Sequence, residues 1–225
     1  MILITTYYKS KNEDRQKEID RCLKNNFENI YIEKIYLLNN ELYDLNFKGN
    51  KIIQIIISKE KDYILKYKDA IQFINENLKN KICILSNSDI YFDETLSKIN
   101  NNNIKDNFFA LLRYDEQEDG SKKIFTRYDI PRDDSQDCWI FNSPLNIDLN
   151  KLNFSFRTLG CDSIFSTIVH QSNINVSNPS YDIIITHLHK TEFRTYNVDD
   201  RIHGKYCLIK PCHLNEKYEV SFMEY

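Results

Sequence analysis

The sequence of 225 residues has no apolar run that approaches the roughly 20 residues of a membrane-spanning helix. Its first apolar stretch, Ile2 to Ile4, passes at once into hydroxyl side chains and is too short to be the apolar core of a signal peptide. The sequence therefore predicts a soluble protein of the cytoplasm that has no membrane span.

Neither basic nor acidic residues predominate, because 30 basic residues are balanced by 33 acidic residues, for a net charge of −3. No basic stripe marks a nucleic-acid surface, so no nucleic-acid partner is predicted. Only four glycines and four prolines occur, and no stretch has the composition of a linker between domains. The 41% of hydrophobic residues predicts a packed globule, so a single domain, 1–225, is expected. Its oligomeric state stays open.

Six cysteines are present, but none lies at the short spacing of a zinc knuckle. Cys207 and Cys212, which flank the sequence Leu-Ile-Lys-Pro, form at most a structural pair. The other cysteines lie in segments with the pattern of ordinary helices or strands. We therefore expect reduced thiols and no dense disulfide framework.

The first half of the chain alternates predicted strands and helices. The expected strands are Ile2–Tyr7, Glu33–Leu38, Lys51–Ile57 and Lys81–Leu85, and the expected helices are Glu13–Asn25 and Asp62–Leu78. Lys51–Ile57 is nearly continuous in isoleucine, as a strand buried on both faces would be. This order predicts an α/β fold with a Rossmann-like, mostly parallel sheet flanked by helices.

The second half is less regular. Strands are expected at Phe108–Arg113, Asp137–Phe141 and Tyr181–His189, and a helix is expected from about Gly160 to Gln171. Residues 115–135 are interpreted as a charged excursion, and Asn100–Asn103 as a solvated loop. The domain is thus divided into a regular half, 1–105, and a mixed half, 106–225.

Short polar side chains follow three of the predicted strands at the point where each strand ends. They are Thr5, Thr6, Asn39, Asn40, Asn87, Ser88 and Asp89. In open parallel sheets, ligands bind beyond the carboxyl ends of the strands. The sequence therefore predicts a binding site at this edge of the sheet.

Asp89 is the first candidate metal ligand. A carboxylate at a strand end suits a hard divalent ion that bridges phosphate oxygens, and Asn87 and Ser88 could then hold a ribose hydroxyl or a metal-bound water. The alternative makes Asp89 a turn or helix-capping residue. Asp93 is interpreted first as a helix N-cap and second as a ligand.

A second candidate group is His187 with His189. Positions two apart in a strand point to the same face, so both imidazoles could serve one metal site together with Asp89. Lys190 and Arg194 follow, and their cations could neutralise a diphosphate. The alternatives are an exposed strand edge for the histidines and a solvated charged face for the two cations.

Two further carboxylates have two interpretations each. Asp162 near the start of a predicted helix is either an N-cap or a group that accepts the proton of a substrate hydroxyl. Asp137 faces the same choice. Beside it, Trp139 forms either a platform for sugar stacking or a plug of the core.

Two arginines are interpreted differently. Arg113 ends an apolar strand, so its charge must reach an edge of the sheet or pair with an acid such as Asp115. Arg15 is expected to be a solvated residue of the first helix and not a phosphate ligand.

Eight blocks of sequence carry a family resemblance. In order they are ILITTYY, IEKIYLLNN, ILSNSDIYFDETL, ALLRYD, SQDCWIF, LGCDSIFSTIV, VSNPSYDI and THLHKTEFRTY. This ordered set, which spans most of the chain, resembles the small nucleotide-sugar-dependent glycosyltransferases of the GT-A fold found in bacteria and large DNA viruses. The resemblance implies a GT-A-like single domain in which 1–105 binds the nucleotide sugar and 106–225 faces the acceptor.

The resemblance also implies a metal site. In GT-A enzymes a DxD-type motif after a core strand binds a divalent ion, commonly manganese, which holds the sugar-nucleotide diphosphate. Here the motif reads Asn87-Ser88-Asp89, so its first aspartate is missing. A histidine near the C-terminal end often completes the site, which matches His187 or His189 by position. The expected cofactor is Mn²⁺ or Mg²⁺.

The expected reaction moves a hexose from a nucleotide sugar, a UDP-sugar by analogy with the family, to a hydroxyl acceptor. The acceptor would be a glycan or a protein hydroxyl, conceivably hydroxylysine of a viral collagen-like protein in the host cytoplasm. Asp162 or Asp137 would orient or deprotonate the acceptor, and inversion or retention stays open. The residues expected to bind the nucleotide are Thr5, Thr6, Asn39, Asn87, Ser88, Arg113, Lys190 and Arg194.

Two rival functions remain at the level of sequence. A metal-dependent phosphoesterase would use the same aspartate and histidines with water as its nucleophile. A non-catalytic module that binds a sugar or nucleotide would keep the Trp139 platform and need no metal.

Overall fold

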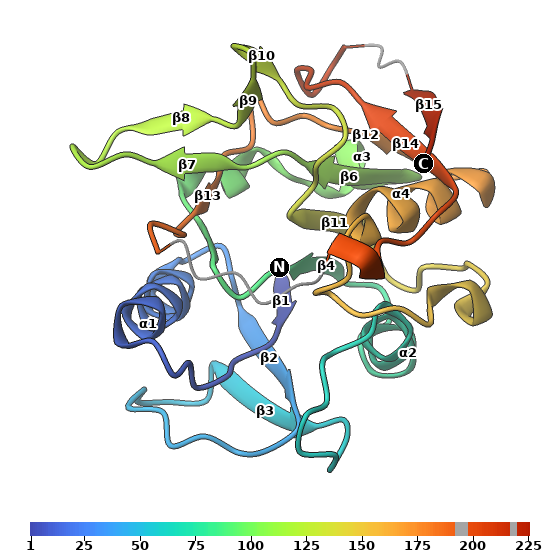
Figure 1. The fold of residues 1–225 in the computed structure, drawn as a ribbon. Helices are drawn as coiled ribbons and strands as arrows, with labels where there is room; N and C mark the ends of the chain where they lie inside the picture. Colours follow the sequence, from blue (N-terminus) through green and yellow to red (C-terminus); the bar gives the residue numbers. More distant parts are fainter. Residues whose placement is uncertain (192–197, 217–219) are drawn as a thin grey trace.

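The computed structural model describes residues 1–191, 198–216 and 220–225. Its centre is a seven-stranded sheet in the order β12-β6-β11-β4-β1-β2-β3 (Figure 1). The strands are β1 (Ile2–Thr5), β2 (Lys34–Asn39), β3 (Ile52–Ile56), β4 (Ile82–Ser86), β6 (Asn107–Leu111), β11 (Cys138–Asn142) and β12 (Asn175–Ser177). β11 runs antiparallel to both neighbours, and the other pairings between these strands are parallel. The predicted α/β class with a mostly parallel sheet is confirmed.

A second sheet has the order β5-β13-β7-β8 and was not predicted as a unit. Its strands are β5 (Ile90–Phe92), β13 (Ile185–His187), β7 (Tyr114–Glu116) and β8 (Lys122–Ile124). Two hairpins complete the strands: β9 (Thr126–Arg127) with β10 (Ile130–Pro131), and β14 (Lys205–Ile209) with β15 (Val220–Glu224). Residues 115–135 are therefore not a plain excursion, because strand pairing satisfies much of their backbone.

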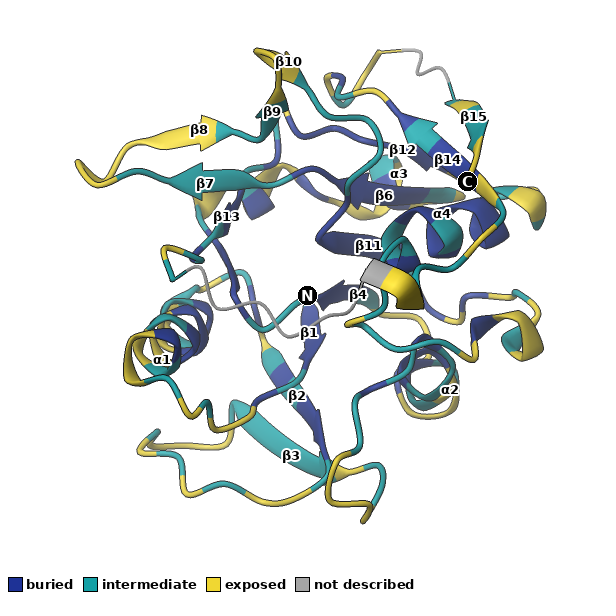
Figure 2. Ribbon diagram, viewed as in Figure 1, coloured by how far each residue is buried: buried dark blue, intermediate teal, exposed yellow. Residues whose placement is uncertain are grey.

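Helices cover both faces of the seven-stranded sheet. They are α1 (Glu13–Glu28), α2 (Tyr67–Asn77), α3 (Asn101–Ile104) and α4 (Cys161–Gln171), with 3-10 turns at Glu94–Lys98, Leu149–Leu152 and Val198–Asp200. Alternate residues of each strand face opposite ways, so Ile2 and Ile4 pack with α2 and α4, while Leu3 packs with α1 and α3. The sheet is thus sandwiched, with its central strands the most buried (Figure 2).

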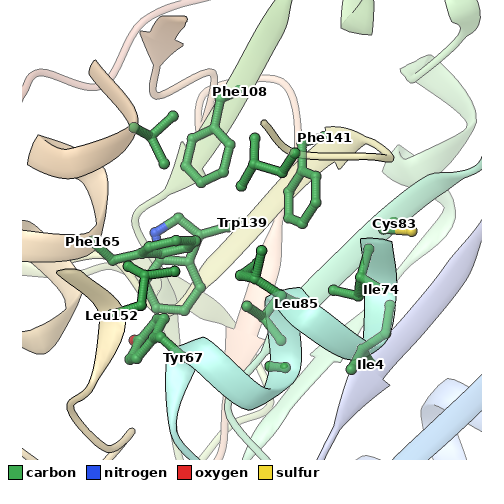
Figure 3. Packing of buried hydrophobic residues seen from close by; sticks show 14 of the residues in the cluster. Ile4, Tyr67, Ile74, Cys83, Leu85, Phe108, Trp139, Phe141, Leu152 and Phe165 are labelled. Atoms are coloured by element: carbon green, nitrogen blue, oxygen red, sulfur yellow. The ribbon is translucent and has the colours of Figure 1, made fainter. Parts of the chain in front are cut away.

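Aromatic side chains fill the face under α2 and α4. Trp139 of β11 is fully buried and lies against Tyr67 and Phe165, with ring centroids 5.3 Å away in both cases (Figure 3). Its indole Nε1 donates to the Ser166 hydroxyl at 3.3 Å. Trp139 is therefore a core residue, and its interpretation as a platform for a sugar is wrong.

Other predicted boundaries change for local reasons. Helix α2 begins at Tyr67 because the residues before it are extended: Tyr67 N–H donates to Phe154, and Leu65 accepts from Phe156. β3 is an edge strand of intermediate burial, so its isoleucine run does not mark a strand buried on both faces. Asn100–Asn103 is no plain loop, because Asn100 caps the short helix α3 with a reciprocal capping box.

Helices long and apolar enough to cross a bilayer do not occur in the part of the chain that the structure describes.

Candidate metal centre

The candidate site begins at the carboxyl ends of three adjacent strands. β4, β1 and β2 are neighbours in the sheet and run parallel, so Ser86, Thr5 and Asn39 end at the same edge. The predicted convergence of strand ends is confirmed. Asn87 to Asp89 leave this edge and connect the large sheet to β5 of the small sheet.

The register of the small sheet brings the candidate ligands together. Ile90, directly after Asp89, pairs with His187 of β13, and His187 also pairs with Asp115 of β7. Asp89 and His187, which are 98 positions apart in the sequence, therefore lie in contact. β13 ends at His187, so His189 lies beyond the strand that was predicted to contain it.

Asp89, His187 and His189 form one cluster. The Oδ2 atom of Asp89 lies 3.2 Å from Nε2 of His187 and 3.7 Å from Nδ1 of His189. The two imidazoles stack with centroids 5.4 Å apart and planes 26° apart. One potential ligand atom from each residue lies within 4.8 Å of the others, so the group could hold a metal ion. The structure brings both imidazoles together with Asp89, as the sequence predicts, and their role as metal ligands stays a prediction.

Two buried atoms in this cluster have no partner among the described residues. They are Oδ1 of Asp89 and Nε2 of His189. Buried polar atoms are normally hydrogen-bonded, so this pair fits a site that binds a ligand. The Nδ1 atom of His187 lies 3.0 Å from Oδ1 of Asp115, an arrangement in which the carboxylate fixes the ring and presents Nε2 to the cluster. These residues fit a divalent cation.

The charges of the cluster balance one another without a cation. Burial alone would raise the pKa of Asp89, but His187, His189 and Arg15 hold it well below its usual range. Burial alone would lower the pKa of His187, yet the carboxylates of Asp89 and Asp115 raise it to about 9. His187 is therefore an imidazolium at neutral pH in the metal-free protein, and a bound cation would take the place of its proton.

Arg15 is part of this site, contrary to its interpretation as a solvated residue. Its side chain is buried, and its NH2 group donates to Oδ2 of Asp89 at 2.5 Å. The signal was present in the sequence, because Arg15 lies four residues before Ile19 and so on the apolar face of α1. Its charge is acceptable there only because Asp89 and Glu18 neutralise it.

A second ion-pair chain leads from the cluster to Asp137. Arg113 donates from Nε to Asp115 at 2.9 Å and from NH1 to Asp137 at 3.2 Å. Asn87 donates from Nδ2 to Oδ1 of Asp137 at 3.3 Å. The predicted pairing of Arg113 with Asp115 is confirmed. Since two carboxylates balance its guanidinium, Arg113 has less charge to offer a diphosphate than its sequence position suggests.

Asp162 lies beside this chain, at the first turn of α4. Its Oδ2 atom accepts from the backbone N–H of Gln136, next to Asp137, at 3.1 Å. Gly160 is the N-cap of α4, so the interpretation of Asp162 as the cap is wrong. Burial and the nearby Asp137 carboxylate raise the pKa of Asp162 to about 6. A carboxyl group with such a pKa can accept a proton near neutral pH.

Gly160 holds the start of α4, and with it Asp162, in place. It has a φ of +82°, and a Cβ atom added there would lie 1.7 Å from the Tyr206 hydroxyl oxygen. We expect Gly160→Ala to destabilise the protein by about 2–6 kcal/mol, because the backbone strain and the collision cost about 1–3 kcal/mol each and add. Urea unfolding would measure this, with Gly120→Ala as a control whose added Cβ meets open space at a similar φ. Equal losses in both variants would show that the Tyr206 contact is unimportant.

The remaining predicted residues lie at or near the same edge. The hydroxyl of Thr5 is buried without a described partner, while Thr6 and Ser88 are half-buried. Asn39 accepts from the backbone N–H of Tyr7 at 2.9 Å, so it fastens the end of β1 to β2. Lys190 is exposed and approaches Glu116 at 3.4 Å. Arg194 lies outside the described residues. The assignment of these residues to a nucleotide stays a prediction.

Sequence reasoning missed Glu18 and Glu116, and it gave Asp115 no place at the metal site. Asp93, by contrast, was correctly interpreted as a cap: its carboxylate accepts from Thr95 N–H at 3.0 Å. The missed residues are acids on polar surfaces of α1 and β7, where carboxylates are common and usually solvated. Only the pairing of the small sheet reveals their partners.

Compared with models of protein families and with curated proteins, the chain matches none of them.

Proposed function

We propose that this protein is a metal-dependent glycosyltransferase that moves a hexose from a nucleotide sugar to a hydroxyl acceptor. The proposal is carried by the Asp89, His187 and His189 cluster, which includes two buried polar atoms without a described partner, beside the carboxyl edge of the parallel strands β4, β1 and β2. Ligands bind at such edges in open α/β sheets. The resemblance of the ordered sequence blocks to GT-A enzymes supports a UDP-sugar as the donor.

The donor atoms favour manganese over magnesium. Two imidazoles and one carboxylate offer more nitrogen than Mg²⁺ accepts, since that ion prefers carboxylates, phosphates and water. A divalent cation bound there would supply positive charge against the negative charge that develops on a departing nucleoside diphosphate. The protein residues do the rest: Asp115 fixes the ring of His187, and Arg15 fixes one oxygen of Asp89.

Asp162 is assigned to the acceptor. Its raised pKa allows the carboxylate to accept a proton from a hydroxyl, while the neighbouring Asp137 is held by Arg113 and Asn87 and cannot move freely. The charge of Asp137 thus raises the basicity of Asp162, and Asp137 is not assigned to the acceptor itself. Of the two carboxylates that the sequence offers for the acceptor, Asp162 and Asp137, we therefore propose Asp162.

Thermal shift with nucleotides tests the proposal. We expect UDP to raise the melting temperature in the presence of Mn²⁺ and to have little effect with a chelator, because ligand stabilisation follows the ratio of free ligand to its Kd. GDP and free hexoses are the comparison ligands. Equal stabilisation by UDP with Mn²⁺ and with the chelator would remove the metal from the proposal.

A metal-dependent phosphoesterase is the second candidate. A site of two histidines and one acid also holds the metal in hydrolytic zinc enzymes, so the ligand set alone does not separate the two reactions. Product analysis does: a phosphoesterase would cleave a simple phosphodiester without any acceptor, whereas the transferase requires a nucleotide sugar. The binding-module alternative has lost its main support, because Trp139 is buried in the core.

A further inference from the structure

The segment that carries both histidines is fastened to α1 by a glutamate. Oε1 of Glu18 accepts the backbone N–H groups of Lys190 at 2.7 Å and Thr191 at 3.1 Å. Oε2 accepts the Thr191 hydroxyl at 3.1 Å and the NH1 group of Arg15 at 2.9 Å. Within the described part of the chain, the hydrogen bonds of this carboxylate go to Arg15 and to the two residues directly after His189.

Arg15, one helical turn away, holds the other side of the segment. Its NH1 group also donates to the backbone oxygen of Leu188 at 2.9 Å, between the two histidines. Its NH2 group holds Oδ2 of Asp89. One guanidinium thus joins the carboxylate of the cluster to the backbone that carries both imidazoles.

An apolar contact and a backbone bond complete the attachment. Leu188, 2% exposed, packs with Cys22 of α1 and Tyr91 of β5. Its N–H donates to the backbone oxygen of Asp89 at 2.9 Å. Leu188 thus anchors the segment by burial. A buried ion pair often stabilises a fold no better than apolar residues, so the charges of Arg15 and Glu18 leave room for a role beyond stability.

We propose that Arg15 and Glu18 form a clamp that positions the segment 187–191, and so sets the separation of His187, His189 and Asp89 for metal binding. This inference rests on the proposed metal-dependent function. Preorganised ligands raise metal affinity, since the ordering of the site is complete before the ion binds. Arg15 also binds Oδ2 of Asp89, while Oδ1 has no partner among the described residues. Both residues are positioning residues.

Two measurements on Glu18→Ala test the clamp. In the metal-free protein, amide hydrogen exchange at Lys190 and Thr191 is expected to speed up at least about tenfold, because their N–H groups lose their acceptor. The Kd for Mn²⁺, followed by the electron spin resonance signal of the free ion, is expected to rise about 10–100-fold, the usual effect of residues that hold ligands. Glu18→Gln, which can still accept both N–H groups, should keep slow exchange and show a smaller rise.

The matched control is Asp14→Ala. Asp14 pairs with Lys17 on the same helix at the same spacing, but both side chains are exposed, 73% and 74%, and touch no part of the cluster. Exchange and Kd should stay as in the wild type. If Asp14→Ala speeds up amide exchange and raises the Kd for Mn²⁺ as much as Glu18→Ala does, the effect comes from a general change in helix α1. That result would overturn the clamp.

The remaining outcomes separate the clamp from the proposed function. Unchanged exchange in Glu18→Ala overturns the clamp whether or not the metal binds, and faster exchange with an unchanged Kd shows that the attachment does not position the site. A wild-type protein that binds no Mn²⁺ overturns the metal-dependent function, while the exchange result still decides the clamp. If Glu18→Ala does not fold, Arg15→Lys carries the test, and a wild-type Kd in that variant overturns the proposal.

Discussion

Asp162→Asn is expected to lower the turnover of hexose transfer by about a hundredfold or more, the usual scale for the loss of a general base. The amide keeps the shape of the carboxylate and can still accept the Gln136 N–H, so the affinity for the nucleotide should change little. Steady-state rates with a UDP-sugar, and its Kd by calorimetry, separate the two effects. Wild-type turnover in Asp162→Asn would transfer the role of base to Asp137.

The pH dependence gives a second readout for Asp162. The pKa of this carboxyl group is raised from 3.8 to about 6 by burial, so turnover should rise with pH through about 6 as the base loses its proton. The folded state binds that proton more tightly than the unfolded state, so the contribution of Asp162 to stability falls as pH rises between these two values. The stability of Asp162→Asn should not show this decrease with rising pH. Parallel stability curves for the wild type and the variant would contradict the raised pKa.

His189→Gln is expected to raise the Kd for Mn²⁺ by more than about 100-fold, since even residues that only hold a ligand contribute 10–100-fold. The melting temperature should fall only slightly, because Nε2 of His189 has no described partner and Nδ1 lies 3.7 Å from Oδ2 of Asp89, beyond ordinary hydrogen-bond distance. The control is His213→Gln, which removes an exposed histidine that pairs with Asp182. Tight Mn²⁺ binding by His189→Gln would exclude this imidazole as a ligand.

Asp89→Ala is a poorer test of the same site. A strand-end residue with little packing would be expected to tolerate alanine, but Asp89 neutralises the buried Arg15 and His187. Removing one partner of a buried ion pair costs about 3–5 kcal/mol, so this variant is expected to lose stability as well as metal. Chemical unfolding would detect the loss. A melting temperature equal to that of the wild type would show that the ion pairs are weak.

The sequence predicts the large sheet well, because period-two and period-3.6 patterns report burial on one face of an element. The boundaries of β1, β2, β4 and α1 agree with their expected ranges to within a few residues. The patterns mislead where backbone pairing, and not the burial of one face, determines the secondary structure. The apolar residues before Tyr67 continue the helical spacing, yet their backbone pairs with residues 154–156.

The candidate site could be predicted only in part, because some of its residues are placed by contacts between elements that are far apart in the sequence. Asp89 and the two histidines follow from residue type and strand position. Arg15 follows less directly: its spacing from Ile19 places it on the apolar face of α1, but a charge on such a face is ordinarily solvated at the boundary. Only the approach of Asp89 makes its burial favourable. Asp115 likewise depends on the three-residue strand β7, which is too short to show a period.

The small sheet has a consequence for how the protein matures. Asp89, Asp115 and His187 come from three distant stretches, and no one of them approaches another until β5, β13 and β7 have paired. The fragment 1–105 contains the strand ends of the large sheet but lacks both imidazoles, so it cannot assemble the centre by itself. Metal binding would therefore indicate that β13 has paired with β5 and β7. A newly synthesised chain would lack the complete cluster until His187 and His189 had been made and this pairing had formed.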